Sequence, residues 1–184
     1  EIPLRLVGSE MCIRDRWSHS IVFNDVERRK GNMKTNELYL KTLFCCCACD
    51  GEIAQEEVGM IKELTEKSTL FQDIQVEYLI NEYVNQINNQ GKVFLKDYLS
   101  ELSNTVLSDD EQITLIDLAL RMIEADKQIL YSEVKFFKKI RSRISVSDEQ
   151  ILLKLSGIED YFQPDICAEN KDFEDIGEFK QISF

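Results

Sequence analysis

Apolar residues recur every three to four positions along most of the chain, and this spacing predicts α-helices. No segment keeps the strict alternation of a β-strand, so the sequence predicts an all-α fold of about seven helices. The spacing also places Tyr78 and Val106 among the inward-facing residues, and it predicts that the second half of the first helix is buried. The expected helices are 34–49, 54–67, 73–87, 92–107, 108–123, 132–144 and 147–155.

Three turns carry signals for the start of a helix. Ser108 is followed three residues later by Glu111, and Ser147 by Gln150, which is the spacing of a capping box. Asp73 is expected to cap the helix that follows it. These signals separate the expected helices and leave only short connections between them.

The turn after the first expected helix has a counterpart in the second half of the chain. Sliding the first turn along the sequence sets Asp50 on Asp126, Ile53 on Ile129 and Glu57 on Glu133. Apolar positions in the flanking helices match as well. The sequence therefore predicts an internal duplication, with two pseudo-symmetric helix–turn–helix halves.

Each residue type in the first turn has a local physical reason. Gly51 tolerates the left-handed conformation that ends a helix, and the Asp50 carboxylate is expected to accept N–H groups of the turn. Ile53 is expected to fill the gap between the two helices. Glu56 and Glu57 fall in the first turn of the next helix, where the helix dipole favours negative charge.

The ends of the chain differ in character from its middle. Residues 1–16 resemble a translated sequencing adapter, and 17–32 read as a leader upstream of a native start at Met33. The helical domain is expected at 33–157. Residues 158–184 form an acidic tail with scattered aromatic residues. The tail is expected to be mobile, and the alternative is that it folds back through its aromatic side chains.

The formal net charge of −12 bears on the choice of partners. It disfavours nucleic acid and anionic membranes, and it suits cations, basic partners or simple solubility. No run reaches the roughly 18 apolar residues of a membrane span. The apolar run at 38–49 resembles a short lipoprotein signal, but Glu37 and Lys41 interrupt it, so we expect a cytoplasmic protein.

Four cysteines at the end of the first helix suggest zinc or redox chemistry as one hypothesis. They are Cys45, Cys46, Cys47 and Cys49. The next cysteine is the distant Cys167, and no histidine follows residue 33, so a four-ligand zinc site is hard to complete. Small buried residues between closely packed helices are the favoured interpretation.

The repeated turn, an aspartate with isoleucine three and glutamate seven positions later, resembles the TerB-like family of tellurite-resistance proteins. This family also includes the N-terminal domain of the co-chaperone DjlA, and the resemblance covers about residues 38–155. It implies a cytoplasmic stress-response domain that binds a protein partner or acts as a scaffold, and a divalent-cation site, Ca²⁺ or Mg²⁺, between the halves. By position, the implied ligands are Asp50, Glu52, Glu56, Glu57, Asp126 and Glu133.

The chain departs from the family pattern at several of these positions. Lys127 and Gln128 follow the second aspartate where family members have glycine, and Ala54 and Leu130 replace the usual Ser or Thr cap. The acids therefore have two interpretations. They are hard-cation ligands, as oxygen donors suit Ca²⁺ and Mg²⁺, or they satisfy N–H groups of the turns and helix ends.

No sequence motif for catalysis is found: there is no P-loop, nucleophile elbow or His–carboxylate set, so we do not expect an enzyme. The His-Pro-Asp motif of a J domain is also missing. Two functions stay open from the sequence. One is a TerB-like binding or scaffold domain with a cation, and the other is a ligand-free structural domain for protein interaction, of the DjlA N-terminal type.

Overall fold

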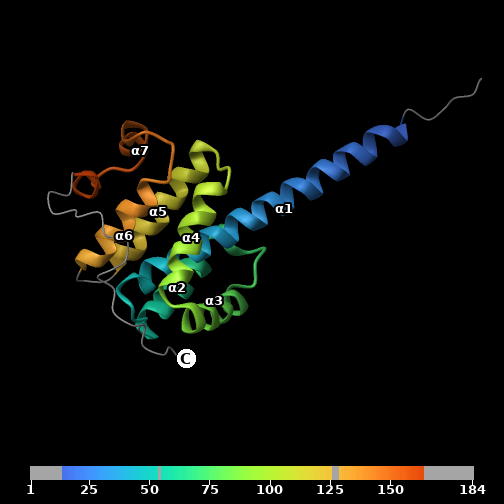
Figure 1. Ribbon diagram of the computed structural model, residues 1–184. Helices are drawn as coiled ribbons and strands as arrows, with labels where there is room; N and C mark the ends of the chain where they lie inside the picture. The colour runs from blue at the N-terminus through green and yellow to red at the C-terminus, as the bar shows by residue number, and fades with distance from the viewer. Residues whose placement is uncertain (1–13, 54, 126–128, 164–184) are drawn as a thin grey trace, which may run out of the picture. The chain divides into compact units, whose positions relative to one another are not determined.

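The computed structural model describes residues 14–53, 55–125 and 129–163, and these residues form an all-α fold without strands (Figure 1). The prediction of seven helices is confirmed. None of the described helices is apolar over a stretch long enough to cross a membrane. The α-helices are α1 (Arg14–Cys47), α2 (Gln55–Lys67), α3 (Val76–Gln90), α4 (Lys92–Asn104), α5 (Asp109–Ala125), α6 (Tyr131–Arg141) and α7 (Asp148–Lys154). Three short 3-10 helices are η1 (Ala48–Asp50), η2 (Thr69–Phe71) and η3 (Glu159–Phe162).

The first helix begins earlier than the sequence predicted. It was expected at 34–49, but α1 begins at Arg14 and η1 completes its C-terminal end. Residues 17–32 contain no proline, so nothing in them breaks a helix. The chain divides into two compact units, 1–34 and 35–184, and the boundary lies within α1.

The second half of α1 is buried, as predicted. Residues 42–49 are buried without interruption, which requires neighbours on every side of the helix. The Phe44 ring centre lies 5.6 Å from that of Tyr83 on α3 and 5.9 Å from that of Phe94 on α4. The buried Thr42 hydroxyl donates to the Leu38 carbonyl oxygen and accepts from the Tyr98 hydroxyl, both at 2.8 Å. This half of α1 is therefore the centre of the core.

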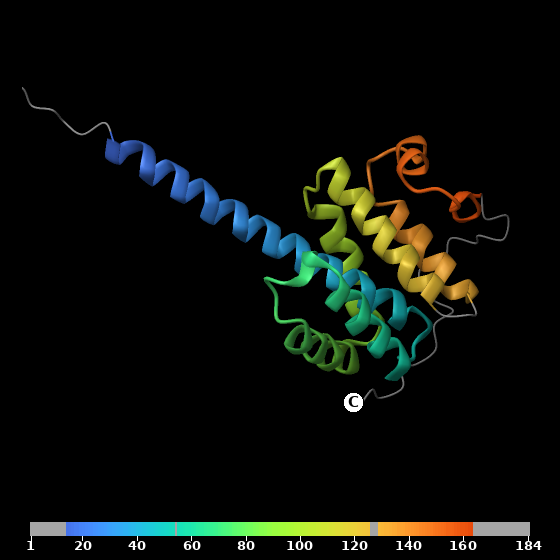
Figure 2. The ribbon, with the colours of Figure 1, turned by 180° about the vertical axis from the view of Figure 1, so that it is seen from behind.

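The amphipathic helices each turn one apolar face to this core. α5 packs against α6 and α2, and α3 packs against α4, as the two opposite views show (Figures 1 and 2). Gly91 joins α3 to α4 with a positive φ of 55°, a conformation that glycine adopts without strain. On α2 this face carries Val58 and Ile61, which are buried.

Three predictions in this region are wrong. Asp73 does not cap α3, which begins at Val76 after the turn that follows η2. Tyr78 is 63% exposed, because it lies about 200° around the helix from the buried Ile80 at 100° per residue. Val106 is 98% exposed, because α4 ends at Asn104 and the extended chain beyond it has no inward face.

Both predicted capping boxes are confirmed. At the start of α5, the Glu111 carboxylate accepts the Ser108 N–H at 2.8 Å, and the Ser108 hydroxyl accepts the Glu111 N–H at 3.4 Å. At the start of α7, Ser147 and Gln150 make the same reciprocal pair, each bond at 3.3 Å. The helix starts are therefore set by residues within three positions of one another.

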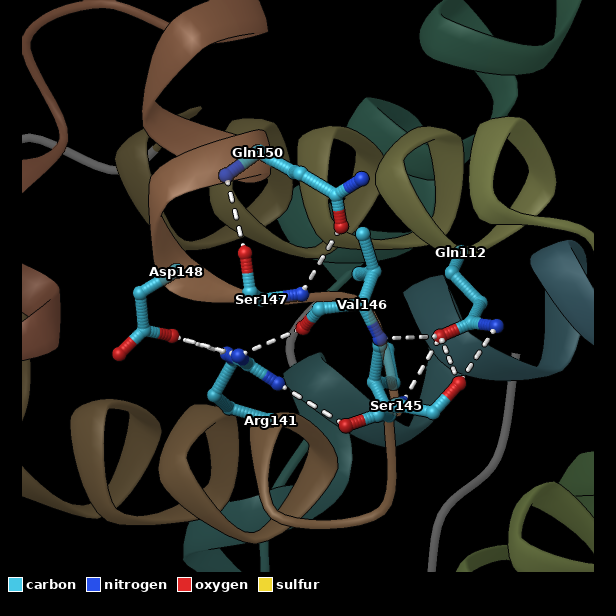
Figure 3. Close-up of polar contacts among 8 residues, drawn as sticks. Gln112, Arg141, Ser145, Val146, Ser147, Asp148 and Gln150 are labelled. Carbon is cyan, nitrogen blue, oxygen red and sulfur yellow. Dashed lines mark hydrogen bonds and ion pairs between the residues drawn. The ribbon is translucent and has the colours of Figure 1, made fainter.

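A buried glutamine fixes the connection between α6 and α7 to the start of α5 (Figure 3). The Gln112 side-chain oxygen accepts the N–H groups of Ser145 at 2.9 Å and Val146 at 3.0 Å. Its Nε2 donates to the Leu107 carbonyl oxygen at 2.9 Å. One side chain thus satisfies backbone groups from two connections that are far apart in the sequence.

Arg141, the last residue of α6, holds the other side of the same connection (Figure 3). Its guanidinium donates to the carbonyl oxygens of Ile144 at 3.0 Å and Val146 at 2.8 Å. Its Nε donates to the Asp148 carboxylate at 2.7 Å. The arginine therefore closes the turn that carries the chain into α7.

The first residues of the expected tail fold back on α6. Ile158 is buried, and the ring centres of Tyr161 and Phe162 lie 5.7 and 5.9 Å from that of Phe137. For residues 158–163 the expectation of a mobile tail is therefore wrong, and the aromatic alternative holds, because aromatic burial outweighs the charge density there. The rest of the tail, 164–184, lies outside the described residues.

Replacement of Gln112 by leucine should destabilise the fold. Gln112→Leu leaves two N–H groups and a carbonyl without partners, so we expect a loss of about 2–4 kcal/mol in the free energy of unfolding. Gln86→Leu is the control, since its amide bonds only locally to Glu82 on α3, and its effect should stay below about 1 kcal/mol. Urea unfolding measures both, and equal losses would contradict the bridging role of Gln112.

Candidate functional site

The first acidic turn has the geometry that its sequence predicted. Gly51 adopts a left-handed φ of 98°, and its N–H donates to the Ala48 carbonyl oxygen at 3.2 Å. The Asp50 carboxylate accepts the N–H of Glu52 at 3.0 Å. Asp50 therefore serves as a turn-forming residue, and its side chain is exposed at the surface.

The remaining acids of the first turn differ in their surroundings. Glu52 and Glu56 are exposed, whereas Glu57 is half-buried. Glu56 and Glu57 lie in the first turn of α2, as predicted, where they interact favourably with the helix dipole. The charge of Glu57 acts on the buried thiol of Cys47 and raises its pKa.

The second turn is described only from Ile129 onward. The Glu133 carboxylate accepts the N–H of Leu130 at 2.7 Å, which is one half of a capping box. The other half is missing, because leucine has no side-chain acceptor where a serine or threonine would provide one. Asp126, the remaining predicted ligand, lies outside the described residues.

Folding brings acids from both turns to the C-terminal end of α1. η1 packs against α6, which places the first turn beside the helix that follows the second. The charge of Glu133 acts on Cys46, Cys47 and Cys49, and Asp50 acts on Cys49. Of these acids, Glu133 acts on three of the thiols, whereas Asp50 acts on Cys49 and Glu57 on Cys47.

The arrangement of these side chains bears on cation binding. Within 31–53, 55–125 and 129–163, no three Cys, Asp, Glu or His side chains lie where they would hold one metal ion. The carboxylates of Asp50 and Glu133 each accept a backbone N–H. In the structure these two acids therefore satisfy N–H groups of a turn and of a helix end, which is the alternative to cation binding that the sequence left open.

The four cysteines are buried free thiols, in line with the favoured interpretation of them as small core residues. Burial is the main cause that raises the pKa of each thiol. Neighbouring negative groups add to the effect, with Glu57 the next largest for Cys47 and Glu133 for Cys46. At neutral pH the thiols are therefore protonated, and the thiolate is the form that attacks electrophiles or binds soft metals.

A row of exposed apolar residues was not predicted. Ile129, Leu130 and Tyr131 are 48, 39 and 53% exposed, although Ile53, the counterpart of Ile129, packs against the core. Three consecutive apolar residues cannot all lie on one inward face, and this signal was available in the sequence. We call these three residues the apolar turn surface.

The folded start of the tail adds a tyrosine to this region. The side chain of Glu124, near the end of α5, acts on the Tyr161 hydroxyl. Partial burial and the charges of Glu124, Glu133 and Asp160 raise the pKa of Tyr161 to about 12. The tyrosine therefore stays protonated at neutral pH.

Comparison with known proteins gives no relative for this chain: no family model, no curated protein and no solved structure matches it. The resemblance to the TerB-like family thus rests on the repeated turn alone and stays a prediction. The function has to be argued from the two turns and their surroundings.

The buried thiols should resist modification in the folded protein. We expect iodoacetamide at pH 8 to label Cys46 and Cys49 at least about 100-fold more slowly than in guanidinium-unfolded protein, because labelling requires local opening and a thiolate. Mass spectrometry of the cysteine-containing peptides measures both rates. Similar rates in the two states would mean that these thiols are accessible and available for chemistry.

Proposed function

We propose that this chain is a TerB-like helical domain that binds a protein partner, as an adaptor or scaffold in a cytoplasmic stress response. The family part of the proposal rests on the repeated turn and on the all-α fold that accompanies it. The binding part rests on one observation, the apolar turn surface formed by Ile129, Leu130 and Tyr131. The binding part can hold even if the family assignment fails, because the exposure of these three residues does not depend on the family.

The apolar turn surface is unusual for residues at the start of a surface helix. Contiguous exposed apolar residues with a polar rim mark interaction sites in soluble proteins. The equivalent part of the first turn places Ile53 against the core. The two halves therefore differ at this point, and only the second presents these side chains to solvent.

The rim of this surface suggests the charge of the partner. Glu133 lies two residues after Tyr131, within the first turn of α6. Lys135 Nζ lies 4.8 Å from the centre of the Tyr131 ring and rests over its face. With a net charge of −12 on the chain, a partner that combines apolar side chains with basic groups suits the surface best.

A second proposal concerns a divalent cation at the acidic turns. It rests on the family resemblance and on the positions of Asp50 and Glu133 in the two turns, although no three such side chains among the described residues lie where they would hold one ion. The hydrogen bonds that Asp50 and Glu133 accept from backbone N–H groups compete with it. In this proposal Ca²⁺ or Mg²⁺ takes oxygen donors from both turns, with Asp126 as a further ligand.

Polar substitution in the apolar turn surface should remove partner binding. We expect Ile129→Gln combined with Tyr131→Gln to reduce recovery of the partner at least about tenfold in quantitative affinity capture from the native source. The loss corresponds to removing the apolar contacts at the centre of an interface. The matched control is Leu153→Gln on α7, which also removes an exposed apolar side chain (86% exposed).

Two outcomes decide this prediction. Both variants should melt within a few degrees of the wild type, since exposed substitutions change stability by about 0.5 kcal/mol. If the double variant captures the same proteins in the same amounts as Leu153→Gln, the apolar turn surface is not the binding site.

The cation proposal predicts stabilisation by metal. A site with a Kd of about 0.5 mM would add about 1.4 kcal/mol at 5 mM Ca²⁺ or Mg²⁺, which is a rise of about 3 °C in melting temperature. Glu133→Gln should abolish this metal-induced rise, whereas Glu66→Gln, an exposed acid on α2, should preserve it. The absence of any rise in the wild type would support the ligand-free interaction domain.

A further inference from the structure

The second half of α6 is basic in a chain whose formal net charge is −12. Five of the nine residues from 135 to 143 are lysine or arginine. Lys135, Lys138 and Lys139 have i, i+3 and i+4 spacing, so they share one face of the helix. This face lies opposite the buried side of α6, and the three side chains are half-buried. We call these three residues the basic stripe.

The chain returns to the basic stripe after α7. Lys138 Nζ donates to the carbonyl oxygen of Gln163 at 2.9 Å. The Arg141 guanidinium carbon lies 5.9 Å from the ring centre of Phe162, which itself packs on Phe137. The last described residue of the chain is therefore held directly against a lysine of the stripe.

The sequence that follows Gln163 is complementary in charge to the stripe. Residues 164–184 contain six acidic residues and two lysines. Phenylalanines alternate with these acids, so the segment also offers apolar contacts. The acidic residues are Asp165, Glu169, Asp172, Glu174, Asp175 and Glu178.

We propose that residues 164–184 bind within the same molecule along the basic stripe of α6. The segment is long enough, since 21 residues reach up to about 70 Å, whereas an 11-residue helix is about 16 Å long. Individual surface ion pairs are weak. The attachment at Gln163 compensates for this, because it makes the binding intramolecular and gives the segment a high effective concentration at the stripe.

This inference does not depend on the function proposed above. With the segment in place, the basic stripe is covered by the protein's own carboxylates. The folded domain then presents a more uniformly acidic surface, which excludes polyanionic ligands from α6. The acidic segment is therefore an intramolecular competitor for any acidic ligand of the stripe.

Zero-length carbodiimide cross-linking of the full chain tests the proposal. An equal mixture of ¹⁴N- and ¹⁵N-labelled protein distinguishes links within one molecule from links between two. We expect links within one molecule from residues 165–178 to Lys135, Lys138 or Lys139 to exceed those to Lys62, Lys67 and Lys96 at least about fivefold. They should fall in 1 M salt, where the Debye length shrinks to about 3 Å.

Matched triple variants give an independent readout. Chymotrypsin should cut at Phe173 and Phe179 about three- to tenfold faster when Lys135, Lys138 and Lys139 are all replaced by glutamine. A control that replaces Lys67, Lys92 and Lys96 removes the same charge and should cut at the wild-type rate. Circular dichroism checks that both variants are folded.

Two results would overturn the proposal. One is a set of cross-links spread evenly over lysines of the stripe and of α2 and α4 in the wild type. The other is a set of stripe cross-links found only between differently labelled molecules, which would assign the contact to two copies of the chain. Because these results come from the unmodified protein, they decide the question even if the triple variant loses its fold.

Discussion

The burial of the last turns of α1 is the constraint on which the rest of the fold depends. A helix that is apolar around its whole circumference, as at 42–49, is stable in water only when other elements surround it. The aromatic contacts of Phe44 with α3 and α4, and the Tyr98 hydroxyl bond to Thr42, show how closely they approach. Each amphipathic helix can cover the end of α1 in this way, because one of its faces is apolar.

The same burial decides the chemistry of the candidate site. The cysteines at the end of α1 lie where their thiols are shielded from water, so burial raises their pKa and keeps them protonated. η1 packs against α6, and the charge of Glu133 on α6 acts on three of these thiols. Negative charge beside protonated thiols opposes thiolate formation further, which favours a packing role for the cysteines and leaves binding to the exposed surfaces.

Much of the fold could be predicted because its signals are local. Helical spacing defined the seven helices, and the capping boxes at Ser108 and Ser147 fixed two of their starts. The left-handed Gly51 and the Asp50 bond to the Glu52 N–H followed from residue type alone. Several wrong predictions came at the ends of elements, since α4 ended before Val106, α3 began after Asp73 and α1 began at Arg14.

By itself, the sequence determined the helices, the geometry of the first turn and the acidic character of the chain. These properties arise from interactions among residues a few positions apart. Only the tertiary structure decided that Gln112 bridges to Ser145 and Val146, that Tyr161 folds back on Phe137, and that Ile129 is exposed while Ile53 packs against the core. Each of these contacts and exposures depends on which surfaces stay uncovered after helices distant in the sequence have packed. A pattern of neighbouring residues carries no information about that packing.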